Sequence, residues 1–242
     1  MKKIAIIPSR YGSSRFPGKP LALIKGKPMI EWVVKNISKC KDIDDIYVAT
    51  DDQKIFDVCE SLDIKAIMTS DKHLTGTDRI GEVARKVEAD LIVNIQGDEP
   101  LIKAEMVQDL YSCFDSEEVY MGTLKKKIEV EEELDNPNVV KVINDVNDYA
   151  IYFSRFCLPF ERDGKKTTHF KHIGAYGYKV WFLKQYSKMA KTPLEISESL
   201  EQLRVLENGY KIRVKETKHQ TVGVDTPEQV KQVEEELRKA GL

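Results

Sequence analysis

Long apolar runs are missing from this 242-residue sequence, and so is a marked net charge of either sign. The first apolar run follows Met1 closely and ends after four residues at Pro8, which is too short for a signal peptide. No segment reaches the roughly 20 apolar residues of a membrane-spanning helix. The 38 basic and 40 acidic side chains nearly cancel, so overall charge attracts neither nucleic acid nor an anionic membrane. We therefore expect a cytoplasmic protein with neither kind of partner.

Cysteine is scarce, and the four residues are far apart in the chain. They form no Cys-x-x-Cys pair, and none stands near a histidine at the spacing of a zinc site. We expect all four to be reduced, as is usual in the cytoplasm; a disulfide pair is the less favoured alternative. They are Cys40, Cys59, Cys113 and Cys157.

Several familiar catalytic motifs are also missing. Gly12 and Gly18 have five residues between them and Pro20 follows Lys19, so the spacing of the GxxxxGK[ST] phosphate loop is not met. The dinucleotide fingerprint GxGxxG is missing too, which disfavours a nicotinamide-dependent reductase. There is no Gly-x-Ser-x-Gly, no His-Glu-x-x-His and no Cys/His nucleophile pair. The sequence therefore offers no candidate for covalent catalysis.

What the sequence does have is a regular alternation of short apolar runs with segments of helical period. This pattern predicts an α/β protein with a Rossmann-like, mainly parallel central sheet flanked by helices, and a smaller mixed lobe. We expect residues 1–242 to form a single domain, with residues from about 125 to 220 contributing the lobe. Strands are expected at 4–7, 46–49, 66–68, 91–95, 119–124, 139–143, 149–153, 172–178 and 212–215, and helices from residue 28, over 55–62, from a cap at Thr77, and over 180–190, 198–207 and 227–239.

A basic loop, residues 8–20, follows the first strand. In open α/β sheets, ligands bind beyond the carboxyl ends of the strands, and this loop lies at such an end. Small residues let its backbone approach phosphate oxygens, and Arg10, Arg15 and Lys19 add positive charge. A nucleoside triphosphate carries a charge of about −4, which three cations and a divalent metal ion would neutralise. The loop therefore predicts a nucleotide site; a solvated surface loop is the alternative.

Two aspartates stand where a metal ion could bind. Asp98 follows the buried strand at 91–95, where a carboxylate is costly unless it is paired or holds a metal. Asp225 precedes a helix start in which Thr226, Pro227 and Gln229 can form the cap, so it has no role in the cap itself. Magnesium at phosphate sites uses one or two carboxylates. Each aspartate alone is explained as well by a turn or a helix boundary.

The loop and its neighbours resemble the CMP-sugar synthetases over nearly the whole chain. The loop matches as IIPSRYGSSRFPGKPL at 6–21. Eight further segments, in the same order, are similar to the branch that activates 3-deoxy-manno-octulosonate (Kdo). They are VATD at 48–51, TGTDR at 75–79, VNIQGDEP at 93–100, NPNVVKV at 136–142, YAIYFSR at 149–155, HIGAYGY at 172–178, LEQLRVLE at 200–207 and GVDTP at 223–227.

The resemblance implies a nucleotide-diphospho-sugar transferase fold and a cytidylyltransferase that couples the CMP of CTP to a Kdo-type sugar acid, with Mg²⁺ as cofactor. It also implies a homodimer and a role in lipopolysaccharide or capsule synthesis. Asp98 and Asp225 would hold the metal and, with Arg10 and Lys19, form the catalytic group. The nucleotide would be bound by Arg10, Arg15, Lys19, Thr75, Gly76, Arg79 and Gln96, and the sugar acid by Arg155, His172, Tyr176, Glu201 and Gln202.

The sequence is also compatible with two other functions. The same CTP apparatus could activate a different ulosonic acid, such as 8-amino-Kdo or a sialic acid. A nucleotide-sensing module without catalysis is a second alternative, and the presence of both Asp98 and Asp225 disfavours it.

Overall fold

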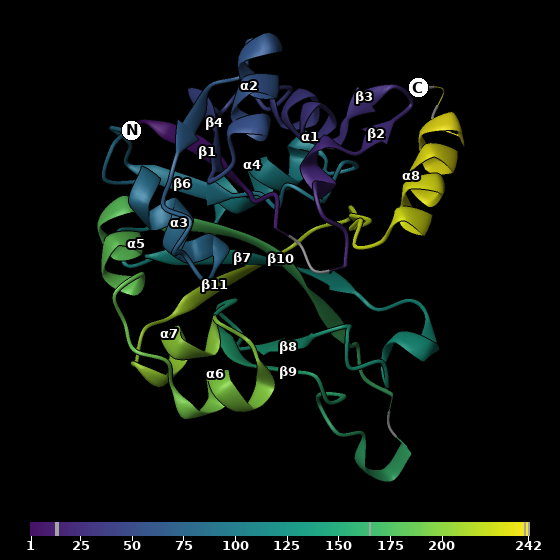
Figure 1. Ribbon diagram of the computed structural model, residues 1–242. Helices are drawn as coiled ribbons and strands as arrows, with labels where there is room; N and C mark the ends of the chain where they lie inside the picture. The colour runs from purple at the N-terminus through teal and green to yellow at the C-terminus, as the bar shows by residue number, and fades with distance from the viewer. Residues whose placement is uncertain (13–14, 165, 240, 242) are drawn as a thin grey trace. The chain divides into compact units, whose positions relative to one another are not determined.

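The computed structural model describes residues 1–12, 15–164, 166–239 and 241. The chain forms two compact units, one of Met1–Gln108 with His219–Leu242 and one of Asp109–Lys218 (Figure 1). The second unit contains nearly all of the range expected to form the lobe. That this range is a sugar-binding and dimerisation lobe of a single domain stays a prediction.

The first unit is built on four parallel strands in the order β6-β1-β4-β5. Residues 4–7 in the central strand are wholly buried, which explains why they form a continuous apolar run. All four strands begin and end within two residues of the predicted limits, so the parallel sheet is confirmed. The bounds are β1 (Lys3–Ser9), β4 (Asp45–Thr50), β5 (Ala66–Met68) and β6 (Leu91–Asn94).

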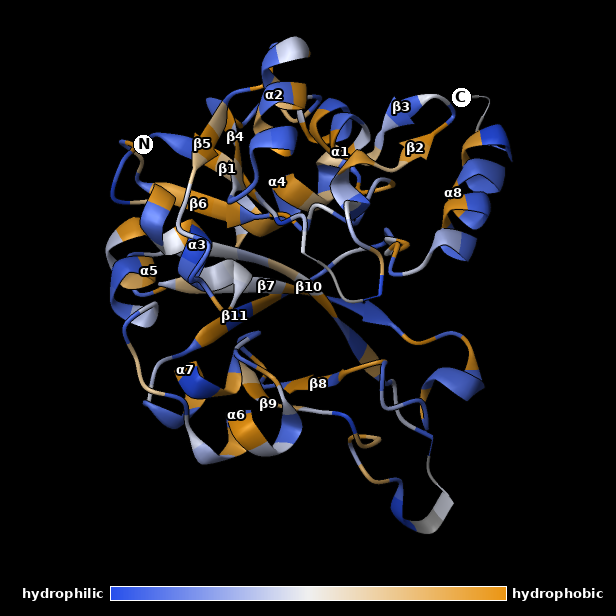
Figure 2. Ribbon diagram, viewed as in Figure 1, coloured by the Kyte–Doolittle hydropathy of each residue, from blue (hydrophilic) through white to orange (hydrophobic). Residues whose placement is uncertain are grey.

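Helices with one apolar and one polar face belong to this unit (Figure 2). In α1 the apolar face includes Ile30, Val33 and Ile37, all fully buried as expected from their spacing. The last helix, α8, has the predicted bounds and buries Val233 and Leu237. The bounds are α1 (Met29–Ile37), α2 (Gln53–Ser61), α3 (Gly76–Val83), α4 (Ala104–Ser112), which continues into the second unit, and α8 (Pro227–Lys239).

The start of α3 corrects the sequence prediction. Its cap is Thr75 and not Thr77, because Thr75 accepts a hydrogen bond from the Asp78 backbone N–H while the Asp78 side chain accepts one from the Thr75 N–H. The reciprocal pair needs an acceptor at the third helical position. For a cap at Thr77 that position would be Ile80, which has no polar atom.

A helix and a two-stranded hairpin of the first unit were not predicted. Helix α4 buries Met106, Val107 and Leu110, a short stripe in a region that reads as irregular in sequence. The hairpin of β2 (Leu23–Ile24) and β3 (Lys27–Pro28) turns at Lys25 and Gly26, both with positive φ, as a two-residue hairpin loop requires.

A compact apolar cluster joins the β2 strand, α1 and α8. Trp32 donates its indole N–H to the carbonyl oxygen of Ile24 at 2.8 Å, and Val224, Val233 and Leu237 pack in the same cluster. The segment just before α8 is thereby anchored to the rest of the unit.

The second unit contains a mixed sheet, as predicted. β7 lies between antiparallel β10 and parallel β11, and β8 pairs antiparallel with both β9 and β10. The strand bounds are β7 (Met121–Lys127), β8 (Lys141–Asn144), β9 (Ala150–Ser154), β10 (Phe170–Lys179) and β11 (Ile212–Glu216). The 3₁₀ helices of the chain are η1 (Lys19–Leu21), η2 (Glu131–Glu133) and η3 (Arg162–Gly164).

The helices of this unit are shorter than expected. Of the helix predicted over 198–207 only the second half is helical, as α7 (Leu203–Glu207); α6 (Pro193–Glu198), which was not predicted, precedes it and ends where Ser199 takes a left-handed conformation. A capping box of Thr192 and Glu195 starts α6. The helix expected over 180–190 ends early, as α5 (Val180–Tyr186).

All four cysteines are free, as expected. Within the described residues, every helix is too short or too polar to cross a bilayer.

Candidate active site

Lys19 joins the two aspartates that the sequence singles out. Its Nζ lies 2.5 Å from Oδ2 of Asp98 and 3.2 Å from Oδ1 of Asp225. Arg15 adds a second cation, with Nη2 3.1 Å from the same Asp225 oxygen. Lys19 is nearly buried, whereas Arg15 is largely exposed. The fold therefore brings four predicted site residues from three distant parts of the sequence into one cluster.

The backbone around the aspartates holds them in place. The Val224 N–H donates to the Asp98 carbonyl oxygen at 2.8 Å, which ties the segment before α8 to the loop after β6. The Gln229 side-chain oxygen accepts from the N–H groups of Asp225 and Thr226, at 2.6 and 3.0 Å. The predicted contribution of Gln229 to the cap of α8 is confirmed, and its reach to Asp225 orients that residue as well.

Gly97 sets how closely the Asp98 loop approaches β1. A Cβ atom at Gly97 would lie 2.8 Å from Ser9 Oγ and 3.1 Å from the Pro8 carbonyl oxygen, too close for any side chain. Ser9 Oγ is itself buried and has no hydrogen-bond partner among the described residues. The two strand ends are therefore in direct contact.

Contacts between Tyr11 and Gly18 join the two ends of the basic loop. Gly18 has a φ of 69°, donates its N–H to the Tyr11 carbonyl oxygen at 2.9 Å and lies against the Tyr11 ring. Lys54 Nζ lies 4.8 Å from the centre of that ring. Arg10 is exposed at the start of the loop. Residues 13 and 14 of the predicted nucleotide loop lie outside the described residues.

The aspartate pair fits a magnesium ion. Within the described part of the chain, no group of three or more His, Cys, Asp or Glu side chains could hold a metal by itself. Magnesium at phosphate sites takes one or two carboxylates and completes its shell with phosphate and water oxygens. Asp98 and Asp225, close enough to share the ammonium of Lys19, supply that number of hard oxygen ligands.

The start of α3 lies beside the end of β1. A Cβ atom at Gly76 would meet the Pro8 ring at 3.4 Å, so the first turn of the helix faces the beginning of the basic loop. Free backbone N–H groups at a helix start attract anions. Thr75 caps this turn, and Gln96 follows β6. Thr75 and Gly76 thus border the same sheet edge as the loop.

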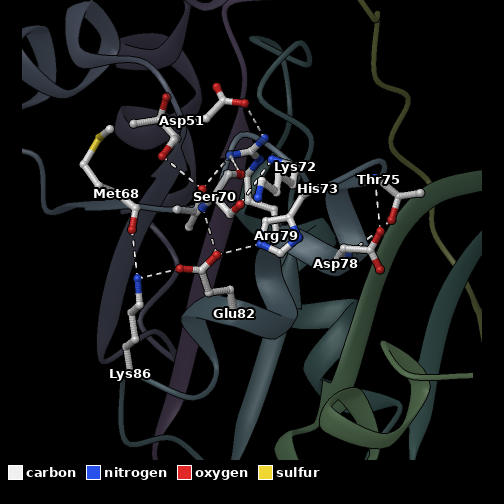
Figure 3. A network of polar contacts seen from close by, with 12 residues as sticks. Asp51, Met68, Ser70, Lys72, His73, Thr75, Asp78, Arg79, Glu82 and Lys86 are labelled. Atoms are coloured by element: carbon white, nitrogen blue, oxygen red, sulfur yellow. Dashed lines mark hydrogen bonds and ion pairs between the residues drawn. The ribbon is translucent and has the colours of Figure 1, made fainter.

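Arg79 is engaged in a network around α3 (Figure 3). Its guanidinium donates to Asp51 at 2.6 Å and to Thr69 Oγ1 at 2.5 Å, and the residue is only 3% exposed. In the same network, Glu82 accepts from the Ser70 N–H and contacts Lys86 and His73. These contacts give Arg79 a structural role, and its predicted place near the nucleoside stays a prediction.

Sequence reasoning missed Glu99, which follows Asp98. Removal from water, and then the charge of Asp98, raise the pKa of Glu99 to about 7. Thr221 donates to its Oε1 at 3.2 Å, while its Oε2 is buried without a partner among the described residues. The adjacent acid pair at a strand end was the signal that could have singled it out.

Arg155, predicted to bind the sugar acid, has its guanidinium turned to backbone carbonyls. It donates to the carbonyl oxygens of Glu198 at 2.7 Å, Pro137 at 2.8 Å and Ser199 at 3.4 Å. The Arg155 N–H also donates to the Glu198 carboxylate at 3.0 Å. These contacts hold β9 against α6, and a sugar-binding role for Arg155 stays a prediction.

His172 and Tyr176 lie together in β10. Their ring centres are 5.4 Å apart, and Phe153 packs edge-on against His172 at 5.0 Å. Burial lowers the pKa of His172 to about 3, so its ring is neutral near pH 7, and burial raises the pKa of Tyr176. The Glu201 carbonyl oxygen accepts from the Tyr186 hydroxyl at 2.9 Å. Gln202 is 3% exposed and its Nε2 has no partner among the described residues.

A basic loop and paired carboxylates at the carboxyl edge of a parallel sheet are an arrangement suited to a nucleotidyltransferase. The profile of the cytidylyltransferase family matches residues 4–212. A 3-deoxy-manno-octulosonate cytidylyltransferase of Fusobacterium nucleatum is 54% identical over 96% of both chains. Its counterpart in Thermodesulfovibrio yellowstonii is 48% identical over 97% of both.

A solved structure agrees with these relatives. The structure of a CMP:2-keto-3-deoxy-manno-octonic acid synthetase complexed with CTP superposes with a TM-score of 0.95 at 40% identity, covering 99% of this chain and all of the other. The chain therefore belongs to the cytidylyltransferase family, in the branch of the 3-deoxy-manno-octulosonate cytidylyltransferases.

Proposed function

We propose that this chain transfers CMP from CTP to Kdo, giving CMP-Kdo and pyrophosphate. The observation that carries the proposal is the cluster of Lys19, Arg15 and two aspartates at the carboxyl edge of the sheet, in a chain 54% identical to a 3-deoxy-manno-octulosonate cytidylyltransferase. A related synthetase with the same fold was solved with CTP bound. The product would supply an activated sugar acid for lipopolysaccharide or capsule assembly.

The reaction is a displacement at phosphorus. The anomeric hydroxyl oxygen of the sugar attacks the α-phosphorus of CTP and releases its proton to the solvent. The bond between the α-phosphorus and the oxygen that bridges to the β-phosphate breaks, and pyrophosphate leaves. Such transfers depend on positioning and on charge stabilisation, which agrees with a chain that has no nucleophile motif.

Lys19 and Arg15 have two roles in this reaction: they neutralise the aspartates, and they bind phosphate. Without nucleotide they neutralise Asp98 and Asp225, so neither sign of charge is left uncompensated. When the triphosphate binds, the two cations and Arg10 contact phosphate oxygens, and the aspartates become available as ligands for magnesium. A magnesium ion held by Asp98 and Asp225 would neutralise phosphate charge and lower the pKa of the attacking hydroxyl.

The remaining predicted roles belong to the same proposal. Thr75, Gly76, Arg79 and Gln96 would lie near the nucleoside, and the first turn of α3 supports this through its place beside β1. Arg155, His172, Tyr176, Glu201 and Gln202 would bind the sugar acid. The neutral His172 ring and the Gln202 Nε2, which has no partner among the described residues, can both form hydrogen bonds with hydroxyl groups.

Pyrophosphate release tests the function directly. The full chain is assayed with magnesium and one nucleotide at a time, CTP, ATP or GTP, across a panel of Kdo, 8-amino-Kdo and sialic acid. We expect turnover with CTP and Kdo, and little with ATP or GTP. Comparable rates with ATP would overturn the nucleotide assignment, and a faster rate with another sugar acid would replace Kdo as the substrate.

A further inference from the structure

The β10 strand contains a bulge between the two predicted sugar-binding residues. Ile173 pairs with Leu124 and Tyr176 pairs with the next residue back, Thr123, so Gly174 and Ala175 have no partner positions on β7. In a regular strand, residues four apart are separated by roughly 13 Å. Here the rings of His172 and Tyr176 are 5.4 Å apart. The bulge bends the strand, so that the rings of His172 and Tyr176 lie next to each other.

Thr123 holds this bulge from the neighbouring strand. Its Oγ1 lies 2.8 Å from the Ala175 carbonyl oxygen and 3.2 Å from that of Ile173, and it is 2.9 Å from Nε2 of His172. Thr123 is fully buried, and among the described residues these three groups are the hydrogen-bonding contacts of its hydroxyl. A single side chain thus contacts both carbonyls that flank the bulge and the ring beside them.

The proton count at this hydroxyl decides which ring nitrogen of His172 carries the hydrogen. A threonine hydroxyl has one proton to donate, and both carbonyl oxygens can only accept. The hydroxyl therefore donates to a carbonyl and must accept from His172, whose Nε2 carries the proton. Because the ring is neutral near pH 7, its Nδ1 is then a bare acceptor. No described residue is hydrogen-bonded to Nδ1.

The β10 backbone is uncovered at Gly174. Nothing lies within 4 Å of the position that a Cβ atom would take at Gly174, between His172 and Tyr176 in sequence. The buried Nε2 of Gln202, without a partner among the described residues, is a second group of this unit with unused hydrogen-bonding capacity. Under the proposed function, the Nδ1 acceptor of His172 and the Nε2 donor of Gln202 are groups that a polyhydroxylated ligand would use.

We propose that Thr123 is a positioning residue of the sugar-acid pocket: it shapes the β10 bulge and fixes His172 as the Nε2–H tautomer, so that Nδ1 accepts a hydrogen bond from a hydroxyl of the sugar acid. This inference rests on the proposed function for the identity of the ligand. The tautomer and the bulge follow from contacts within one unit of the chain.

The test combines nitrogen NMR with kinetics on the full chain. The protein is labelled with ¹⁵N-histidine, and the signals of His172 are assigned by their loss in His172→Asn. We expect Nε2 protonated and Nδ1 bare in the wild type and in Thr123→Ser, which keeps the hydroxyl. Thr123→Val keeps the volume but removes the hydroxyl, so it should lose this single tautomer and raise the KM for Kdo about tenfold, the effect of one lost hydrogen bond.

The KM for CTP should change less than about twofold in Thr123→Val, because binding of the nucleotide does not involve this hydroxyl. Thr217→Val, which also removes a buried threonine hydroxyl from this unit, is the matched control and should leave the KM for Kdo and the tautomer unchanged. A proton on Nδ1 in the wild type would overturn the proposal. So would a Thr123→Val enzyme with unchanged KM for Kdo, or one whose KM for CTP rises equally.

Failure of the proposed function gives a different result. In that case no sugar acid supports pyrophosphate release in any variant, whereas the nitrogen spectra still establish or refute the positioning of His172 by Thr123.

Discussion

Lys19 contacts both aspartates of the proposed magnesium site. The Lys19 ammonium lies between two carboxylates and offsets their mutual repulsion, as a partly buried ion pair does; under the proposed function it would contact phosphate oxygens when CTP binds. The shared ammonium therefore holds Asp98 and Asp225 close together, as the proposed magnesium site would require.

The aspartates themselves give the first prediction. Asp98→Asn and Asp225→Asn should each lower kcat by about 10²-fold or more, the scale of losing a key electrostatic stabiliser. The double variant should be little worse than either single one, because the two carboxylates would act on one metal ion. The measurement is kcat over a magnesium titration, with a thermal melt to confirm folding.

Asp57→Asn, a change at an exposed aspartate of α2, is the matched control and should leave kcat unchanged. A fully active Asp225→Asn enzyme with the wild-type magnesium dependence would show that Asp225 is not a metal ligand and only flanks the start of α8.

The second prediction concerns the close contact of Gly97 with the end of β1. Gly97→Ala adds a Cβ atom 2.8 Å from Ser9 Oγ and 3.1 Å from a backbone oxygen, so the Asp98 loop must move away from β1. We expect a loss of stability of about 1–3 kcal/mol, together with a lower kcat. Urea unfolding measures the first and pyrophosphate release the second. Gly223→Ala, where nothing lies within 4 Å, should unfold like the wild type; equal losses in both variants would refute the steric argument.

At the scale of elements, α3 is held by a charge network that depends on pH (Figure 3). Although removal from water opposes it, hydrogen bonds from Lys86, the Ser70 N–H and His73 lower the pKa of Glu82 to about 2. A carboxyl whose folded pKa lies below its ordinary value of 4.5 adds stability above that value and loses it as the pH falls toward 2.

Glu82→Gln should therefore be less stable than the wild type at pH 7, by about 2 kcal/mol after allowance for solvent screening. The difference should shrink between pH 4.5 and pH 2, as Glu82 becomes protonated in the wild type. Urea unfolding at several pH values measures it, with the exposed Glu60→Gln as control. A difference that is constant from pH 7 to pH 2 would contradict the network as its source.

Arg155 connects β9 to α6, and its substitution separates two interpretations. The guanidinium donates hydrogen bonds to three carbonyl oxygens in different directions, and the shorter-reaching ammonium of a lysine cannot reproduce this arrangement. Arg155→Lys should lower the free energy of unfolding by about 2 kcal/mol, a decrease in Tm of roughly 4–8 °C. If Arg155 also orients the sugar carboxylate, the KM for Kdo should rise while CTP binding is unchanged.

The two readouts are independent. A lower Tm with an unchanged KM for Kdo would make Arg155 a structural clamp only, and a collapse of CTP affinity would assign it to the nucleotide site.

At the scale of the whole molecule, exposed apolar side chains are candidates for the interface of the predicted homodimer. Phe156 and Phe160 are 81% and 88% exposed, and Ile151 in β9 is also exposed. Isolated exposed apolar residues are common, but large aromatic side chains grouped in one segment are typical of an interface. They support the prediction of a homodimer.

The double variant Phe156→Glu, Phe160→Glu should sediment as a monomer of 27.7 kDa in analytical ultracentrifugation, whereas the wild type should sediment at about twice that mass. The variant should keep its helical circular dichroism, since both side chains face solvent in the single chain. A wild type that is monomeric at all concentrations would refute the predicted dimer.

Local signals in the sequence were sufficient for most elements. A strand buried on both faces must be apolar throughout, which made 4–7 and 91–95 recognisable, and the Thr-Pro start of α8 defined its first residue. The sequence was also sufficient to identify the basic loop, the two aspartates and the family resemblance, because charged residues and the order of motifs do not depend on the fold.

Tertiary structure decided the rest, because it depends on residues that are remote in sequence. Only the folded chain shows that Lys19 lies between Asp98 and Asp225, and that the guanidinium of Arg79 is directed at Asp51. Ser199 and the β10 bulge interrupt patterns that read as continuous, since a left-handed residue or two unpaired residues leave no periodic trace. Sequence determined which groups are present; packing determined which of them meet.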